Sequence, residues 1–128
     1  MVKLRQEDIK TKEVLSWKGI HLFHFTFSAC SMKTRIFMGL KNIDYTGHHI
    51  NLQKKENFSP YFQGITPRSL VPVLVDDGEV HIESNDILKY LDNKFPTLSL
   101  IPKDKEEEIN RMMIEENDLH LDLSLIHI

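Results

Sequence analysis

The chain of 128 residues has little of what defines several large classes of protein. It has one cysteine, which excludes an internal disulfide bond and fits a reducing compartment. Its apolar runs fall well short of the roughly 18 residues that a membrane-spanning helix requires, so no membrane partner is expected. The formal net charge of -3 offers no basic surface for nucleic acid, so no nucleic-acid partner is expected either.

Targeting signals and metal motifs are also missing. The N-terminal stretch MVKLRQEDIKTKEVL has no apolar segment of the kind found in signal peptides. Seven histidines are present, but no cysteines stand near them at zinc-binding spacing. His21 and His24, and likewise His48 and His49, point to opposite faces if they lie on strands. We therefore predict no metal site and expect a soluble cytoplasmic protein.

The composition that remains, with 41% apolar and 27% charged residues, suits one folded domain. Residues 5–17 form a weak helical pattern, and the aromatic run HLFHF at 21–25 predicts a buried strand. A second strand is predicted over 45–52. Between these strands, apolar residues recur at helical spacing and predict one buried helix face, formed by Met32, Ile36, Leu40 and Ile43.

The second half of the chain contains the clearest local signals. A short helix is predicted at 59–65, and two β-branched runs over 71–82 flank the turn DDGE, which predicts a hairpin. A helix beginning at Ser84 ends before Pro96. Its predicted apolar face is formed by Ile87, Leu88, Leu91 and Phe95. A further helix from about Lys103 is expected to turn Ile109, Met112 and Met113 inward.

The order of these elements predicts an α/β fold. The first two strands flank a crossover helix and are expected to be parallel, whereas the last two form a hairpin. The result is a mixed four-stranded sheet with helices on both faces.

Four segments of the chain resemble the N-terminal, thioredoxin-like domain of cytosolic glutathione transferases. They are SACSMKTRIFMGLKNIDY, TPRSLVPVLVDDGEV, ESNDILKYL and FPTLSLIPKDKEE. The resemblance covers residues 20 to 105 and is closest to serine-type, loosely zeta-like members. It implies an N-terminal extension at 1–19, a βαβ-α-ββα thioredoxin-like domain at 20–98, and at 99–122 a linker with the first helix of a truncated all-helical domain.

The last six residues, LSLIHI at 123–128, fit no part of this pattern. They match the in-frame translation of a transposon-end adapter used in sequencing libraries. We therefore predict a non-native tail without specific packed contacts, on a chain truncated near Asp122. The alternative is a genuine apolar tail.

The resemblance also implies a glutathione site. Val71, before a cis Pro72, would pair with the backbone of the tripeptide like an added strand. Glu83 would bind its amino group, and Ser84 with the helix N-terminus would bind the adjacent carboxylate. Ser84 also fits a plain N-cap. Lys54, or its neighbour Lys55, would pair with the glycine carboxylate.

By the same resemblance, Ser28 lies at the catalytic position and would donate a hydrogen bond that favours the glutathione thiolate. Cys30 is a second candidate, since a thiol at a helix N-terminus is acidified. It also fits a small packed residue. Ala29 replaces the second serine of zeta-type members, and Ser31 is expected to be the helix cap. Ser69 stands where the family has glycine, which suggests a changed turn.

The function implied is activation of glutathione for attack on a small electrophile, or for isomerisation, within a larger protein expected to be a homodimer. One alternative is a non-catalytic transferase-like module for binding or assembly. Another is a thiol transferase that depends on Cys30.

Overall fold

The computed structural model describes residues 3–96 and 99–118, so the predicted tail at 123–128 lies outside the described residues. The strands are β1 (Ile20–His24), β2 (Thr46–His49), β3 (Val73–Asp76) and β4 (Glu79–Ile82). The α-helices are α1 (Ala29–Leu40), α2 (Pro60–Gln63), α3 (Ser84–Lys94) and α4 (Glu106–Asp118). Short 3-10 helices are η1 (Gln6–Asp8), η2 (Lys12–Ser16), η3 (Glu56–Phe58) and η5 (Lys103–Lys105).

The strands form one four-stranded sheet in the order β2-β1-β3-β4. β1 pairs in parallel with β2 and antiparallel with β3, and β3 and β4 form the hairpin. The predicted mixed sheet is thus confirmed. At the hairpin turn, Asp77 and Gly78 both have positive φ, 47° and 85°, as a two-residue type I′ turn requires. A Cβ on Gly78 would also lie 2.2 Å from the carbonyl oxygen of Leu15.

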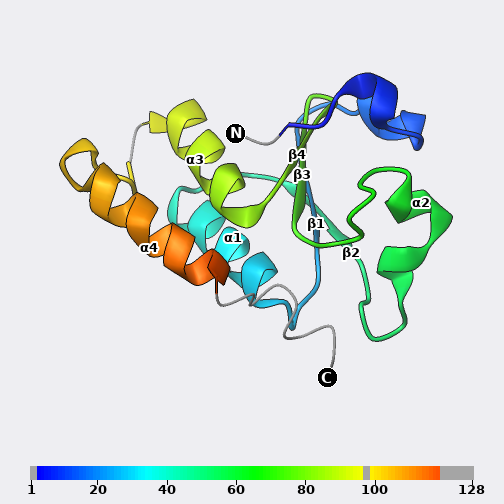
Figure 1. Ribbon diagram of the computed structural model, residues 1–128. Coiled ribbons are helices and arrows are strands. Elements are labelled where there is room, and N and C mark those ends of the chain that lie inside the picture. The colour runs from blue at the N-terminus through cyan, green and yellow to red at the C-terminus, as the bar shows by residue number, and fades with distance from the viewer. Residues whose placement is uncertain (1–2, 97–98, 119–128) are drawn as a thin grey trace.

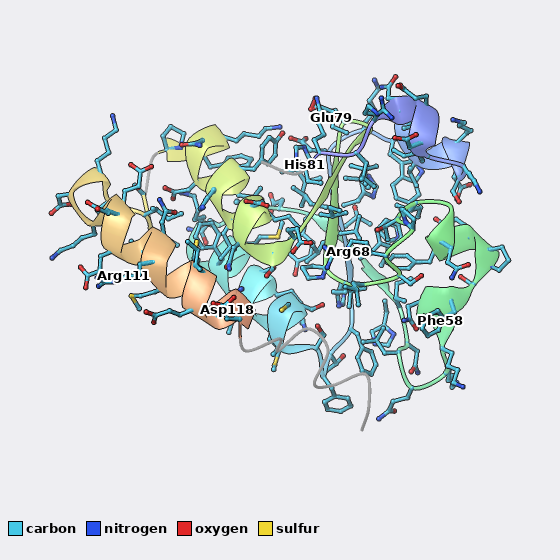
Figure 2. The ribbon with its side chains drawn as sticks, in the orientation of Figure 1. Phe58, Arg68, Glu79, His81, Arg111 and Asp118 are labelled. Atoms are coloured by element: carbon cyan, nitrogen blue, oxygen red, sulfur yellow. The ribbon has the colours of Figure 1, made fainter. Side chains whose placement is uncertain are left out.

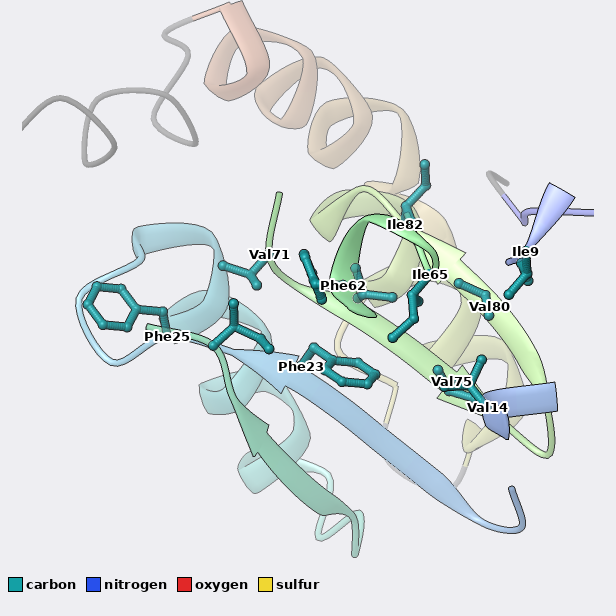
Figure 3. Close-up of a cluster of buried hydrophobic side chains, with 12 residues drawn as sticks. Ile9, Val14, Phe23, Phe25, Phe62, Ile65, Val71, Val75, Val80 and Ile82 are labelled. Carbon is teal, nitrogen blue, oxygen red and sulfur yellow. The ribbon is translucent and has the colours of Figure 1, made fainter. Parts of the chain in front are cut away.

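Helices cover both faces of the sheet (Figure 1). α1 and α3 lie on one face with α4 beside them, and α2 with the N-terminal 3-10 helices lies on the other. The α2 side holds a core in which Phe23, Val75 and Val80 from the strands meet residues from α2 and the N-terminal segment (Figure 3). The opposite core is built from Leu22, Phe37, Met38, Ile43, Leu74, Ile87, Leu88 and Leu91.

The N-terminal segment differs from its prediction. Residues 5–17 form two separate 3-10 helices, η1 and η2, rather than one helix. Ile9 and Val14 are nevertheless buried in the core. The backbone N–H of Lys10 donates to the carbonyl of Gly64 at 2.7 Å. The segment therefore completes the cover on the α2 side of the sheet.

The predicted buried face of α1 is wrong. Met32, Ile36 and Leu40 are 43%, 63% and 59% exposed, although Ile43 beyond the helix is buried. The buried residues of α1 are Ser31, Thr34, Phe37 and Met38. Several faces of a helix can satisfy a 3.6-residue period, and small hydroxyl residues let α1 pack on this one. Thr34 can be buried because its Oγ1 donates to the carbonyl of Cys30 at 3.0 Å.

α4 packs beside α1 and α3. Ile109 and Met113 are half-buried as predicted, but Met112 is 58% exposed, which corrects its predicted inward position. The Nδ2 of Asn85 on α3 donates to the carbonyl of Met113 at 3.3 Å. The burial predicted for Ile87, Leu88 and Leu91 on α3 is confirmed. In the part of the chain that the structure describes, no helix combines the length and apolarity needed to cross a bilayer.

Candidate functional site

Three segments meet beside the N-terminus of α3. They are the beginning of α1, the turn that leads into β3, and the β4–α3 junction. Together they line a cavity of about 30 Å³ that is partly open to solvent. Its walls include Cys30, Arg68, Val71, Pro72, Glu83 and Ser84. Five of these six, all but Arg68, are predicted site residues, so the fold brings most of the predicted site together.

At the beginning of α1, Ser28 is the N-cap. Its Oγ accepts a hydrogen bond from the backbone N–H of Ser31 at 3.2 Å, and the side chain is nearly buried. The prediction that Ser31 caps the helix is therefore wrong. Ser31 is instead buried, with its Oγ accepting from the backbone N–H of Phe25 at 3.3 Å. Cys30, rather than Ser28, lines the cavity and is partly exposed.

The Val71–Pro72 peptide bond is cis, as predicted. The preceding turn closes through the N–H of Ser69, which donates to the carbonyl of Thr66 at 3.2 Å. Ser69 has φ +57°, a value natural for the glycine that the family pattern has there. Within residues 3–96 and 99–118, no hydrogen bond engages the Val71 backbone. An extended peptide can therefore pair with it.

Glu83 is the N-cap of α3, with φ 72° and ψ 111°. That backbone conformation is costly for a residue with a Cβ, of the order of 1–3 kcal/mol. The Glu83 side chain makes no capping hydrogen bond. Ser84 is therefore the first residue of the helix rather than its cap, and the capping role that the sequence also allowed does not apply. Ser84 is 7% exposed and lines the cavity.

Arg68 was missed by sequence reasoning. Its guanidinium forms an ion pair with the carboxylate of Glu83, across the cavity wall. Figure 2 labels Arg68 on the segment that connects α2 to β3. No signal in the sequence joins a turn residue to a glutamate 15 positions later, because only the fold brings the turn before β3 and the start of α3 together.

Glu116 was also missed, since it comes from α4. It lines the cavity and forms an ion pair with Lys33 of α1. The ammonium of Lys33 also donates to Oδ1 of Asn85 on α3 at 2.8 Å. Lys33 thus connects three helices beside the cavity.

The two predicted lysines do not join this group. Lys54 and Lys55 are exposed and are not among the residues that line the cavity. The backbone N–H of Lys54 donates to Oδ1 of Asn51 at 3.1 Å, and Lys55 has φ +59°. Both lie on the segment before α2.

The arrangement suits an extended ligand with charged ends. A helix N-terminus with a serine favours a carboxylate, and Glu83 favours an ammonium group. The Val71 backbone supplies a main-chain partner between them and α1. The N-terminus of α1 favours a negative charge, such as a thiolate, near Cys30 and Ser28.

Comparisons with known sequences identify relatives of this chain. A sequence-family model described as glutathione S-transferase, N-terminal domain, matches residues 22–104. A zeta-class glutathione S-transferase of Euphorbia esula is 40% identical over 85 residues, which is 66% of this chain and 38% of the relative. A probable maleylacetoacetate isomerase of Caenorhabditis elegans is 39% identical over 83 residues, covering 65% and 38%. The chain therefore spans less than half the length of these relatives.

Solved structures show the same likeness. The β-etherase LigF of Sphingobium sp. strain SYK-6 aligns with a TM-score of 0.67 and 34% identity, over 71% of this chain and 39% of its own. A bacterial zeta-class maleyl pyruvate isomerase aligns with a TM-score of 0.67 and 30% identity, over 71% and 44%.

Proposed function

Because the chain belongs to the glutathione S-transferase N-terminal domain family, we propose that it is the glutathione-binding part of a transferase or isomerase. The observation that carries this proposal is one cavity that joins the cis Val71–Pro72 segment to the N-terminus of α3. Those two features supply a backbone partner and a carboxylate site at adjacent positions. A peptide with a charged γ-glutamyl end needs both.

Each side chain then has a distinct task. The Val71 backbone, held by Pro72, pairs with the cysteinyl part of glutathione. Ser84 and the first amides of α3 receive the γ-glutamyl carboxylate, and Glu83 receives the ammonium group. Lys54 binds the glycine carboxylate, which requires the exposed segment around it to approach the ligand.

Ser28 is the proposed hydrogen-bond donor to the glutathione thiolate. Its oxygen accepts from Ser31, so its own proton remains available for donation. The dipole of α1 favours the thiolate form further. Ser28→Ala is therefore expected to raise the pKa of the bound thiol.

The whole protein would be longer than this chain. In our proposal, residues 1–19 are an extension, 20–98 the glutathione-binding domain, and 99–122 the entry to a helical domain. The tail at 123–128 would not belong to it. Three further parts of the proposal follow from the family: a homodimer, a cytoplasmic location and a small electrophilic substrate.

Calorimetric titration of the chain with glutathione tests the binding role. We expect Ser84→Ala to weaken binding about tenfold, because a hydrogen bond to a charged group contributes roughly 1.5–3 kcal/mol. The matched control is Ser16→Ala, an exposed serine on η2. Absence of glutathione binding to the unaltered chain, or equal affinity of the Ser84 variant, would contradict the proposal.

A second candidate function is thiol transfer by Cys30, favoured by its position on the cavity wall. The Cys30 thiolate would attack glutathione disulfide, forming a Cys30–glutathione disulfide and releasing one glutathione thiolate. Mass spectrometry after treatment with glutathione disulfide detects that adduct. If Cys30→Ser leaves transfer unchanged in a thiol-exchange assay, this candidate is excluded.

A further inference from the structure

The group proposed to bind the amino end of glutathione already has a charged partner. Glu83 is paired with Arg68, and both side chains are only partly exposed, at 34% and 44%. In this state the carboxylate of Glu83 is paired with the guanidinium at the cavity wall. A ligand ammonium therefore meets a carboxylate that is occupied, and it must displace a guanidinium to reach it.

The backbones on both sides of this pair are held in place. Arg68 lies in the turn closed by Thr66 and Ser69, and the carbonyl of Ser69 accepts a hydrogen bond at 3.0 Å from the buried amide of Asn57. Glu83 is held at positive φ between β4 and α3. The movable parts are thus the side chains, which can separate without a change in the fold.

The space beside the pair is narrow, with about 30 Å³ accessible to water in a cavity that is partly open to solvent. Because Arg68 and Glu83 both line this cavity, their separation is the direct way to widen it.

We propose that Arg68 and Glu83 form an exchangeable charge pair that recognises an α-amino acid head group. On binding, the α-ammonium takes the place of Arg68 at Glu83, and the guanidinium binds the α-carboxylate. One ion pair is replaced by two, with Ser84 and the α3 amides on the same carboxylate. The inference rests on the proposed function, because it assigns the γ-glutamyl end of glutathione to this cavity.

This exchange makes recognition depend on both charges of the head group. A ligand without the α-carboxylate still displaces Arg68 but gives the guanidinium no new partner. A ligand without the α-ammonium leaves Glu83 paired with Arg68 and competes for the guanidinium. Arginine suits the role because its planar fork binds a carboxylate through two parallel hydrogen bonds.

The test compares glutathione with two analogues by calorimetric titration. One analogue lacks the α-carboxylate (4-aminobutyryl-cysteinyl-glycine), and the other lacks the α-amino group (glutaryl-cysteinyl-glycine). For the unaltered chain we expect each analogue to bind at least about tenfold more weakly than glutathione. In Arg68→Met, the preference for glutathione over the analogue without carboxylate should shrink by at least about threefold without vanishing, because the guanidinium is lost while Ser84 and the α3 amides still bind the carboxylate.

The decisive measurement is the affinity of the analogue without carboxylate. It should bind Arg68→Met more tightly than the unaltered chain, because Glu83 no longer has to release a guanidinium. Arg68→Lys retains the charge without the fork and should fall between the two. The control is Arg5→Met, which removes an exposed arginine paired with Asp8 and should change nothing.

Two failures are distinguishable. If the unaltered chain binds glutathione but Arg68→Met keeps the same preference among the three ligands, the charge exchange is wrong and the proposed function stands. If the unaltered chain binds none of the three, the proposed function fails and this inference fails with it.

Discussion

The two ends of α3 each carry an ion pair, and the pairs differ in almost every respect. At the N-terminal end, Glu83 and Arg68 are 34% and 44% exposed and line a cavity. At the C-terminal end, the side chains of Asp92 and Lys41 are 8% and 1% exposed. The difference separates a pair that can exchange partners from one that holds the fold together.

Asp92 is hydrogen-bonded from three directions. It accepts from Lys41 at 2.7 Å, from the Ser99 hydroxyl at 2.9 Å and from the backbone N–H of Leu100 at 2.8 Å. Burial alone would raise the pKa of Asp92, but these hydrogen bonds hold it below its usual value. Asp92 thereby connects the end of α1, α3 and the segment that leads to α4.

Glu83 has none of this support. Its backbone has a positive φ, and its side chain leaves the amides of α3 uncapped. Strained residues of this kind persist where the surrounding fold imposes them, and they concentrate at functional sites. The N-terminal end of α3 is therefore less stabilised than the C-terminal end.

The largest expected effect is at the C-terminal end. Asp92→Ala leaves the buried ammonium of Lys41 without its carboxylate, and we expect the free energy of unfolding to fall by about 3–5 kcal/mol. Urea unfolding followed by circular dichroism measures it. Asp44→Ala, which removes an exposed carboxylate, should stay within about 0.5 kcal/mol of the unaltered chain.

A loss below about 1 kcal/mol for Asp92→Ala would remove the contrast between the two ends. The pair would then behave like an exposed salt bridge, in spite of its burial.

The next largest effect is expected at the N-terminal end, where a substitution should raise the free energy of unfolding rather than lower it. Glu83→Gly removes a Cβ from a residue with φ 72°, and we expect the free energy of unfolding to rise by about 1 kcal/mol. Glutathione affinity should fall at least about tenfold, because the carboxylate is lost. Urea unfolding and calorimetric titration of the same samples give both quantities.

Glu83→Gln is the companion variant. It retains the strained backbone and the side-chain length but loses the charge, so it should weaken glutathione binding without the gain in stability. A Glu83→Gly variant that loses stability would show that the backbone at this junction is not strained.

The sequence predicted much of this frame, because its strongest signals are local. The turn at Asp77–Gly78 and the apolar spacing of α3 each lie within about a dozen residues, and both were predicted correctly. The cis Val71–Pro72 bond followed from the family resemblance and is present. The turn and the helix face are set by neighbouring residues, and the cis bond belongs to a motif that the family resemblance already identified.

The predictions that were wrong or missing concern features that are set by contacts between distant segments. The apolar spacing of Met32, Ile36 and Leu40 satisfies a helical period as well as the buried face of α1 does, and only the position of the sheet decides between them. The partner of Glu83 was missed for the same reason.

The histidines show the same limit. The prediction that neighbouring histidines face opposite sides is correct, since the register pairs Phe23 with His48 and His24 with His49. That register also brings Nδ1 of His21 to 2.9 Å from Nε2 of His48. Such a contact across two strands requires knowledge of strand register, which the sequence pattern does not contain.

The smallest expected effect is a dependence of the stability of the fold on pH, through a histidine packed on the C-terminal half of α3. His81 of β4 (Figure 2) is 2% exposed and stacks on Tyr90 of α3, with ring centroids 4.0 Å apart. Within the described part of the chain, neither of its ring nitrogens has a hydrogen-bond partner. Burial lowers the pKa of His81, although the carboxylates of Glu79 and Asp76 partly oppose that shift.

The sign follows from proton binding. Because the pKa of folded His81 lies below its unfolded value of about 6.5, the unfolded chain binds more protons between these two values. Stability is therefore complete above pH 6.5 and declines as the pH falls toward the folded pKa. Burial also lowers the pKa of His24 and of His48, so both contribute with the same sign.

His81→Phe removes one of these three groups and keeps the ring stacked on Tyr90. We expect the variant to be more stable than the unaltered chain at pH 6 by less than about 1 kcal/mol, and the difference to shrink toward pH 8. Thermal unfolding across this range measures it. Glutathione affinity should stay unchanged, because His81 does not line the cavity at the other end of α3. If affinity fell along with the pH slope, the two ends of α3 would be coupled rather than independent.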